Sequence, residues 1–162
     1  VEKFNVLQHP EYTEQLCREF AEHFKDKGIQ TVIGPATGGI ILSQVTGRLL
    51  GVRSIFTERE NGKMTLRRGF HIEPGEKVLI VEDIVTTGGS IKEVVDVVNK
   101  AHGDIVGIGL FVDRSGGTAD FGVPKEKVFP LLHLTVPTYK PEECPLCKQG
   151  VPITERGSHH LK

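Results

Sequence analysis

The chain has 162 residues, of which 38% are hydrophobic and 25% are charged, and this is the composition of an ordinary globular domain with a substantial core. Its formal net charge of -1 disfavours broad electrostatic binding to nucleic acid or to a membrane surface. No apolar run approaches the length of a membrane-spanning helix, and no signal peptide is visible.

The cysteines and the chain start add two expectations. Cys17, Cys144 and Cys147 are odd in number, which disfavours a disulfide framework and favours a reducing, cytoplasmic compartment. The sequence begins at Val1 without a methionine, so we expect one domain over residues 1–162 that lacks its extreme N-terminal segment.

The first half of the chain alternates helical and strand patterns. Leu16, Phe20 and Phe24 recur at helical spacing, and Gly28 would end that helix. The predicted elements are a helix over 10–27, a strand over 29–33, a loop over 34–39, a helix over 40–50 and a strand over 52–57. Asn61-Gly62, inside the charged segment 59–68, is a strong signal for the tip of a hairpin.

The second half continues the alternation. It predicts a strand over 78–81, a loop over 86–90, a helix from 91 to about 101, and strands over 104–112 and 128–134. The proline-rich tail, 135–162, is expected to be an irregular arm or a cover over a sheet edge. The fold class is therefore α/β, with a mostly parallel twisted sheet flanked by helices.

The stretch from residue 78 to residue 90 carries the strongest chemical signal. Glu82 and Asp83 follow a buried strand, and an ionised carboxylate is costly to bury unpaired, so we expect both acids where the strand leaves its sheet. The 86–90 loop then offers backbone N–H groups and hydroxyls at a helix N-terminus, which suits a phosphate. Carboxylates bind sugar hydroxyls, so the ligand indicated is a sugar phosphate. The alternative is a polar turn with Thr87 or Ser90 capping the helix.

This stretch resembles the phosphoribosyl-pyrophosphate signature of the type I phosphoribosyltransferases. The resemblance implies their Rossmann-like fold and a binding site for the ribosyl donor. The residues implied to bind it are Ala36, Thr37, Gly38, Glu82, Asp83, Ile84, Val85, Thr86, Thr87, Gly88, Gly89 and Ser90. Read alone, the 34–39 loop is an ordinary tight turn, but beside this signature it resembles the family's pyrophosphate loop.

The charged segment 59–68 has two interpretations. On charge alone it is a solvated hairpin. The resemblance implies a mobile loop that brings Arg59 and Lys63 to the leaving pyrophosphate, and whose cations can also reach the site of a partner subunit in a homodimer. The segment itself contains no histidine, and His71 beyond it is expected along a strand.

Asp113-Arg114 ends a predicted strand beside the site. The pair could form a surface salt bridge, or the arginine could form a two-point hydrogen bond with a substrate carboxylate. In the orotate phosphoribosyltransferases, which the chain resembles from residue 29 onward, the arginine of this pair and the first threonine of the phosphate loop contact orotate. These residues are Arg114 and Thr86 here.

Cys144 and Cys147 have the spacing of half a zinc site, and no second such pair follows. Structural thiols are the favoured interpretation, and a zinc or redox module is the weaker one. The surrounding tail resembles the C-terminus of one branch of the orotate enzymes.

The resemblance implies transfer of the 5-phosphoribosyl group to orotate, giving orotidine 5'-phosphate and pyrophosphate in pyrimidine synthesis. Mg²⁺ is expected, bound mainly by the substrate and reached by Asp83 through water. Catalytic roles are implied for Lys63, Arg59 and Asp83. Two alternatives stay open: a purine or uracil phosphoribosyltransferase, and a non-catalytic regulator that binds the ribosyl donor.

Overall fold

The computed structural model describes residues 2–137, 139–140 and 142–152. Its α-helices are α1 (Phe4–Leu7), α2 (Pro10–Phe24), α3 (Gly38–Leu50), α4 (Gly89–Lys100) and α5 (Pro145–Lys148), with 3₁₀ turns at Lys25–Lys27 and Lys125–Lys127. Its strands are β1 (Thr31–Pro35), β2 (Arg53–Glu60), β3 (Lys63–Leu66), β4 (Lys77–Val85), β5 (Asp104–Asp113) and β6 (Val128–His133).

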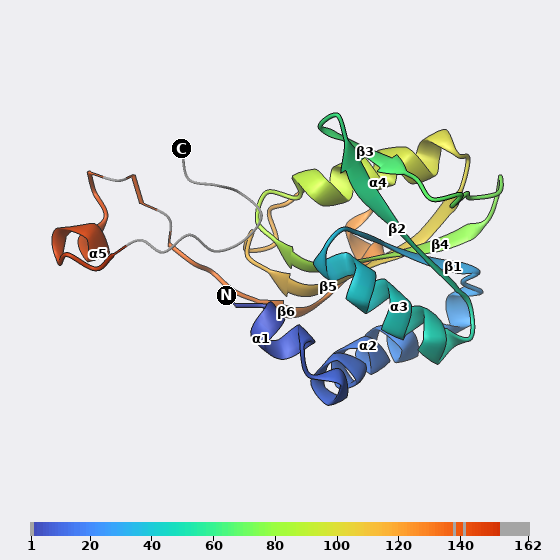
Figure 1. Ribbon diagram of the computed structural model, residues 1–162, viewed down its shortest axis with the longest axis horizontal. Coiled ribbons are helices and arrows are strands. Elements are labelled where there is room, and N and C mark those ends of the chain that lie inside the picture. The colour runs from blue at the N-terminus through green and yellow to red at the C-terminus, as the bar shows by residue number, and fades with distance from the viewer. Residues whose placement is uncertain (1, 138, 141, 153–162) are drawn as a thin grey trace.

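The strands form one sheet in the order β3-β2-β1-β4-β5-β6 (Figure 1). Every neighbouring pair is parallel except β2 and β3, which form an antiparallel hairpin. The hairpin turns at Asn61 and Gly62, whose φ angles of 52° and 79° are those that a tight two-residue turn requires. The expected α/β class and the hairpin tip are both confirmed.

Helices cover both faces of the sheet (Figure 1). Successive side chains of β4 alternate between the faces. Val78 and Ile80 pack into the cluster that includes the apolar side of α4. Leu79 and Val81 pack into the other cluster, with side chains of α1, α2 and α3. Because both faces are covered, the strand is a continuous apolar run rather than an alternating one.

Two glycines on β5 let α2 lie directly on the sheet. A Cβ at Gly107 would stand 2.2 Å from Cε1 of Phe24, and a Cβ at Gly109 would stand 2.8 Å from Cδ1 of Phe20. Any side chain at either position would push these two aromatic rings, which are almost completely buried, off the sheet. The phenylalanines that the sequence places at helical spacing therefore lie over glycines of the strand beneath them.

The structure differs from the sequence prediction at the end of β4 and at His71. β4 does not end before the acids but continues through Glu82 and Asp83 to Val85, since β5 offers ladder partners that far. His71 does not lie along a strand, because β3 ends at Leu66 and His71 sits in the exposed connection to β4. In its described part the tail is an arm, which is one of the two forms expected, and α5 stands apart from the sheet (Figure 1).

Within the described ranges, no helix is long and apolar enough to cross a membrane.

Candidate functional site

The 86–90 loop lines a pocket of about 210 Å³ at the carboxyl end of β4. The pocket is lined by Arg59, Glu82, Ile84, Val85, Thr86, Thr87, Gly88, Gly89, Ser90, Ile91 and Glu93. Its position matches the expectation that ligands bind outside the carboxyl ends of parallel strands. The buried acid and the hydroxyl- and glycine-rich loop that the sequence singled out therefore share one cavity.

The helix after this loop begins without a side-chain cap. The N-cap is Gly88, with φ of 84°, and neither Thr87 nor Ser90 caps α4. A Cβ at Gly88 would also stand 2.9 Å from Cε1 of Phe121. Backbone conformation and close packing both require glycine here, and the uncapped helix N-terminus is left available to an anion.

Glu82 and Asp83 are both buried, but their side chains point in different directions. Glu82 lines the pocket with the 86–90 loop, whereas Asp83 does not. The reason is the alternation of neighbouring side chains along a strand. Burial, followed by the negative charge of Asp83, raises the pKa of Glu82 well above its ordinary value. The Glu82 carboxyl group therefore keeps its proton to a higher pH than an exposed glutamate would.

Asp83 lies against the 34–39 loop. A Cβ at Gly38 would stand 1.6 Å from Oδ2 of Asp83, so the carboxylate occupies the space that a side chain at position 38 would fill. The same oxygen is 2.7 Å from Nζ of Lys3, which comes from the turn before α1. No sequence pattern pointed to Lys3, because nothing local links the start of the chain to the end of β4.

The 34–39 loop is built from close backbone contacts. A Cβ at Gly34 would stand 2.3 Å from the carbonyl oxygen of Gly39. The N–H of Ala36 donates a 2.7 Å hydrogen bond to the carbonyl of Thr57 on β2, and the Ala36–Thr37 peptide is cis. The loop thus brings backbone close to Asp83 at the adjacent end of β4, because β1 and β4 are neighbours in the sheet.

The hairpin places its two candidate cations differently. Arg59 lines the pocket and forms a two-point pair with Glu93 of α4, with N–O distances of 2.7 and 2.8 Å. The N–H of Met64 donates to the same carboxylate at 3.2 Å. Lys63 lies at the tip and lines a neighbouring groove of about 610 Å³, not the pocket. The structure therefore brings Arg59, but not Lys63, to the 86–90 loop of its own chain.

Comparison with known proteins agrees with this geometry. The model of the phosphoribosyl transferase domain family matches residues 5–126. The orotate phosphoribosyltransferase of Desulforamulus reducens is 57% identical over 96% of this chain and 80% of its own length, and that of Thermotoga maritima is 52% identical over 97% and 82%. The chain belongs to the orotate phosphoribosyltransferases. The adenine phosphoribosyltransferase of Rhodothermus marinus shares the fold, with a TM-score of 0.67, 23% identity, and coverage of 80% of this chain and 83% of that one.

Arg114 directly follows β5 and is held against the end of β4. The N–H of Arg114 donates a 2.8 Å bond to the carbonyl of Val85 at the end of β4. Its Nε is buried and has no hydrogen-bond partner among the described residues. A buried donor left without a partner is costly, and this one is therefore free to bind a ligand.

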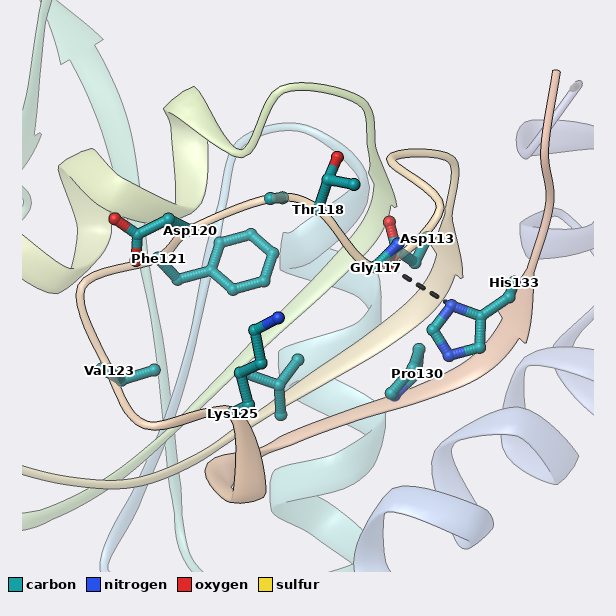
Figure 2. Close-up of a pocket in the computed structure, with 11 residues that line it drawn as sticks. Asp113, Gly117, Thr118, Asp120, Phe121, Val123, Lys125, Pro130 and His133 are labelled. Carbon is teal, nitrogen blue, oxygen red and sulfur yellow. Dashed lines mark hydrogen bonds and ion pairs between the residues drawn. The ribbon is translucent and has the colours of Figure 1, made fainter. Parts of the chain in front are cut away.

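A second pocket of about 380 Å³ lies between β5, β6 and the loop that joins them (Figure 2). Asp113 and His133 meet at its rim, with 3.3 Å between Oδ2 and Nδ1. Burial alone would raise the pKa of Asp113, but hydrogen bonds from Ser115, the nearby His133 and the N–H of Gly117 together lower it. Asp113 is thus an ionised anchor for the loop after β5 rather than a salt-bridge partner of Arg114.

The three cysteines of this orotate phosphoribosyltransferase family member are free thiols. Burial raises the pKa of Cys17, in the core, to about 11. The pKa of Cys144 is lowered by hydrogen bonds from the backbone and thiol of Cys147, whose own pKa is raised by that contact. The described residues contain no cluster of three or more metal-binding side chains, so this pair is not completed into a zinc site there.

Proposed function

We propose that this protein transfers the 5-phosphoribosyl group of phosphoribosyl pyrophosphate to orotate, releasing pyrophosphate and forming orotidine 5'-phosphate for pyrimidine synthesis. Membership of the orotate phosphoribosyltransferases supports the reaction. The observation that carries the proposal is the pocket in which the buried Glu82 faces the 86–90 loop. Such a pocket fits a pentose hydroxyl at one end and a phosphate at the other.

The roles of the residues follow from where charge develops. The bond between the anomeric carbon and the pyrophosphate oxygen breaks, while the orotate ring nitrogen forms the new bond to that carbon. The ribosyl group gains oxocarbenium character, as in glycoside cleavage, and the acidic pair favours that positive charge. The N–H groups of the 34–39 and 86–90 loops hold the leaving pyrophosphate and the 5-phosphate. Orotate attacks as an anion, so no strong base is required.

Magnesium fits the donor chemistry of this site. Glu82 and Asp83 offer hard carboxylate oxygens, and too few protein ligands gather among the described residues to enclose an ion. Mg²⁺ keeps several of its waters and binds through phosphates, so Asp83 would hold it through water. When bound, the ion neutralises charge on the departing pyrophosphate.

We assign the hairpin cations to the leaving group. Arg59 lines the pocket beside the 86–90 loop and serves the site of its own chain. Lys63 lies outside that pocket, which favours a homodimer in which the hairpin tip serves the partner's site. Changing Lys63 to Ala is expected to lower kcat more than it weakens binding of the ribosyl donor. Steady-state kinetics with a Lys92→Ala control would measure this, and an unchanged kcat removes Lys63 from the mechanism.

Base recognition is assigned to Arg114 and Thr86. The guanidinium of Arg114 has a buried, unpaired Nε, and a two-point hydrogen bond to the orotate carboxylate would satisfy it. Thr86 lines the pocket at the start of the 86–90 loop. We expect the protein to act in the cytoplasm, where free thiols are maintained.

One assay tests the reaction. The protein is mixed with Mg²⁺ and the ribosyl donor, and orotate, uracil and adenine are offered in turn while loss of the free base is followed. Consumption of orotate alone is expected. Consumption of uracil or adenine would instead identify a related base specificity. Donor binding without loss of any base would indicate a regulator.

A further inference from the structure

Cys144 and Cys147 lie together on one exposed turn of the C-terminal arm. Cys144 is the residue before α5, and Cys147 is the third residue of that helix. The helix stands apart from the sheet, and Leu146 next to Cys147 is 55% exposed (Figure 1). Cys144 is partly exposed and Cys147 is exposed. Packing in a core therefore does not account for this pair, and both thiols are open to small molecules in solution.

The backbone of the turn holds the two cysteines in a fixed relation. The N–H of Lys148 donates to the carbonyl of Cys144, and the N–H of Gly150 donates to the carbonyl of Cys147, both at 3.1 Å. Pro145 sets the φ angle of the first helical position. Residues three apart on a helical turn lie on the same side of it. The turn therefore presents both thiols on one side.

The two sulfurs are in contact and differ in reactivity. The backbone N–H and the thiol of Cys147 donate to the sulfur of Cys144 and lower its pKa, while the same contact raises the pKa of Cys147. The thiolate is the nucleophilic form of cysteine, so Cys144 is the attacking sulfur and Cys147 is the second sulfur within its reach. Cys17 is the opposite case, because its burial raises its pKa to about 11.

We propose that Cys144 and Cys147 form a thiol–disulfide exchange site, which reacts with a low-molecular-weight disulfide and becomes a reversible internal disulfide. Disulfides that form in a reducing compartment are usually transient and serve catalysis or redox sensing. This chemistry is separate from ribosyl transfer and does not rest on it.

The exchange takes two steps and needs only the external disulfide as oxidant. In the first step, the sulfur of Cys144 bonds to one sulfur of the external disulfide, whose S–S bond breaks and releases one thiolate. In the second step, the sulfur of Cys147 bonds to that of Cys144, and the mixed disulfide breaks and releases the second thiolate. The two released thiolates take up the two protons that the cysteines lose. The pair is oxidised by two electrons, and the external disulfide is reduced by two.

Glutathione disulfide is the probe for the first test. The full chain is reduced, freed of reductant and mixed with the probe and a metal chelator in the absence of oxygen. It is then unfolded in N-ethylmaleimide, and peptide mass spectrometry locates each label and each disulfide. We expect a Cys144–Cys147 disulfide and a label on Cys17 alone. Free thiols at both positions, or a separate glutathione on each without an internal disulfide, would overturn the proposal.

Two matched variants test the order of attack. Cys147→Ser keeps the attacking sulfur but lacks the second one, so glutathione should remain on Cys144 as a stable mixed disulfide. Cys144→Ser leaves only the less reactive sulfur of the pair, and it should take up glutathione about threefold or more slowly. Equal rates in the two variants would contradict the assignment of Cys144 as the attacking sulfur.

Mixtures of reduced and oxidised glutathione at one total concentration measure the advantage of the pair. Because the second sulfur is held beside the first, the internal disulfide should form at a proportion of oxidised glutathione about tenfold or more below that at which Cys147→Ser carries glutathione. Dithiothreitol should return both cysteines to thiols. If the unchanged protein and Cys147→Ser need the same proportion, the pair has no advantage and the proposal fails. These readouts follow the thiols themselves, so they decide the exchange chemistry whether or not the protein transfers a ribosyl group.

Discussion

Buried carboxylates lie near both ends of β4, and their surroundings differ between the two ends. Glu76, just before the strand, accepts hydrogen bonds from the hydroxyl of Thr31, from Arg53 at 3.0 Å and from the N–H of Glu73 at 2.8 Å. Burial acts to raise the pKa of Glu76, but these donors outweigh it and the pKa is lowered. At the other end, burial and the charge of Asp83 raise the pKa of Glu82.

The difference between the two ends separates a structural acid from a functional one. The carboxylate of Glu76 has its donors in place and ties β1, β2 and the connection to β4 together. Glu82 accepts from the N–H of Asp83 and otherwise faces an open pocket. A buried acid whose pKa is raised at a cavity is a candidate for chemistry, whereas a fully hydrogen-bonded one contributes to folding.

The largest effect is expected for Asp83→Asn. The variant keeps the shape of the side chain but removes the charge that Lys3 and the ribosyl donor would meet. Turnover should fall roughly 10²–10³-fold with the fold intact. Steady-state kinetics and circular dichroism would measure this beside Asp26→Asn, an exposed control. Near-normal kinetics would refute the functional role of this end of β4.

Glu76→Gln is expected to act on stability and not on catalysis. Loss of the charge weakens its bonds to Thr31 and Arg53, and because Arg53 is partly exposed we expect a cost of about 2 kcal/mol in the free energy of unfolding. Urea unfolding would measure this, with the exposed Glu73→Gln as control. A large loss of kcat in folded Glu76→Gln would break the distinction between the two ends.

Glu82→Gln should change stability in the opposite direction. A neutral amide avoids the cost of ionising a buried carboxyl group, so we expect a gain on the order of 1 kcal/mol near neutral pH together with reduced activity. The same urea experiment measures the gain. If Glu82→Gln instead destabilised the protein as Glu76→Gln does, both ends would be structural.

The smallest expected effect is on the pH dependence of stability, and this dependence gives the sharpest comparison between the two ends of β4. The folded pKa of Glu76 lies below its ordinary value of 4.5, so its contribution is present above about that pH and is lost as pH falls through the folded pKa. The folded pKa of Glu82 lies above 4.5, so stability falls as pH rises from there through the folded pKa. The loss of stability in Glu76→Gln should become smaller at acidic pH, and the gain of stability in Glu82→Gln should disappear there. Unfolding curves at several pH values would show whether the two trends diverge.

Sequence patterns predicted those parts of the site that lie close together along the chain. The strand, the acidic pair, the 86–90 loop and the helix follow one another directly, and the structure preserves their order around one pocket. The hairpin tip at Asn61 and Gly62 was equally local, because two positive φ angles need such residues. Helix and strand periodicity also gave the α/β class.

By itself, the sequence determined which segments carry the chemistry, since residue type and local spacing decide strand, loop and helix. Only the tertiary structure decided that Glu82 and Asp83 face different surroundings, that Arg59 pairs with Glu93, and that Lys3 reaches Asp83. The physical reason is that such contacts join distant segments, and their meeting depends on strand order and on how the helices pack. No local pattern of residues encodes that order.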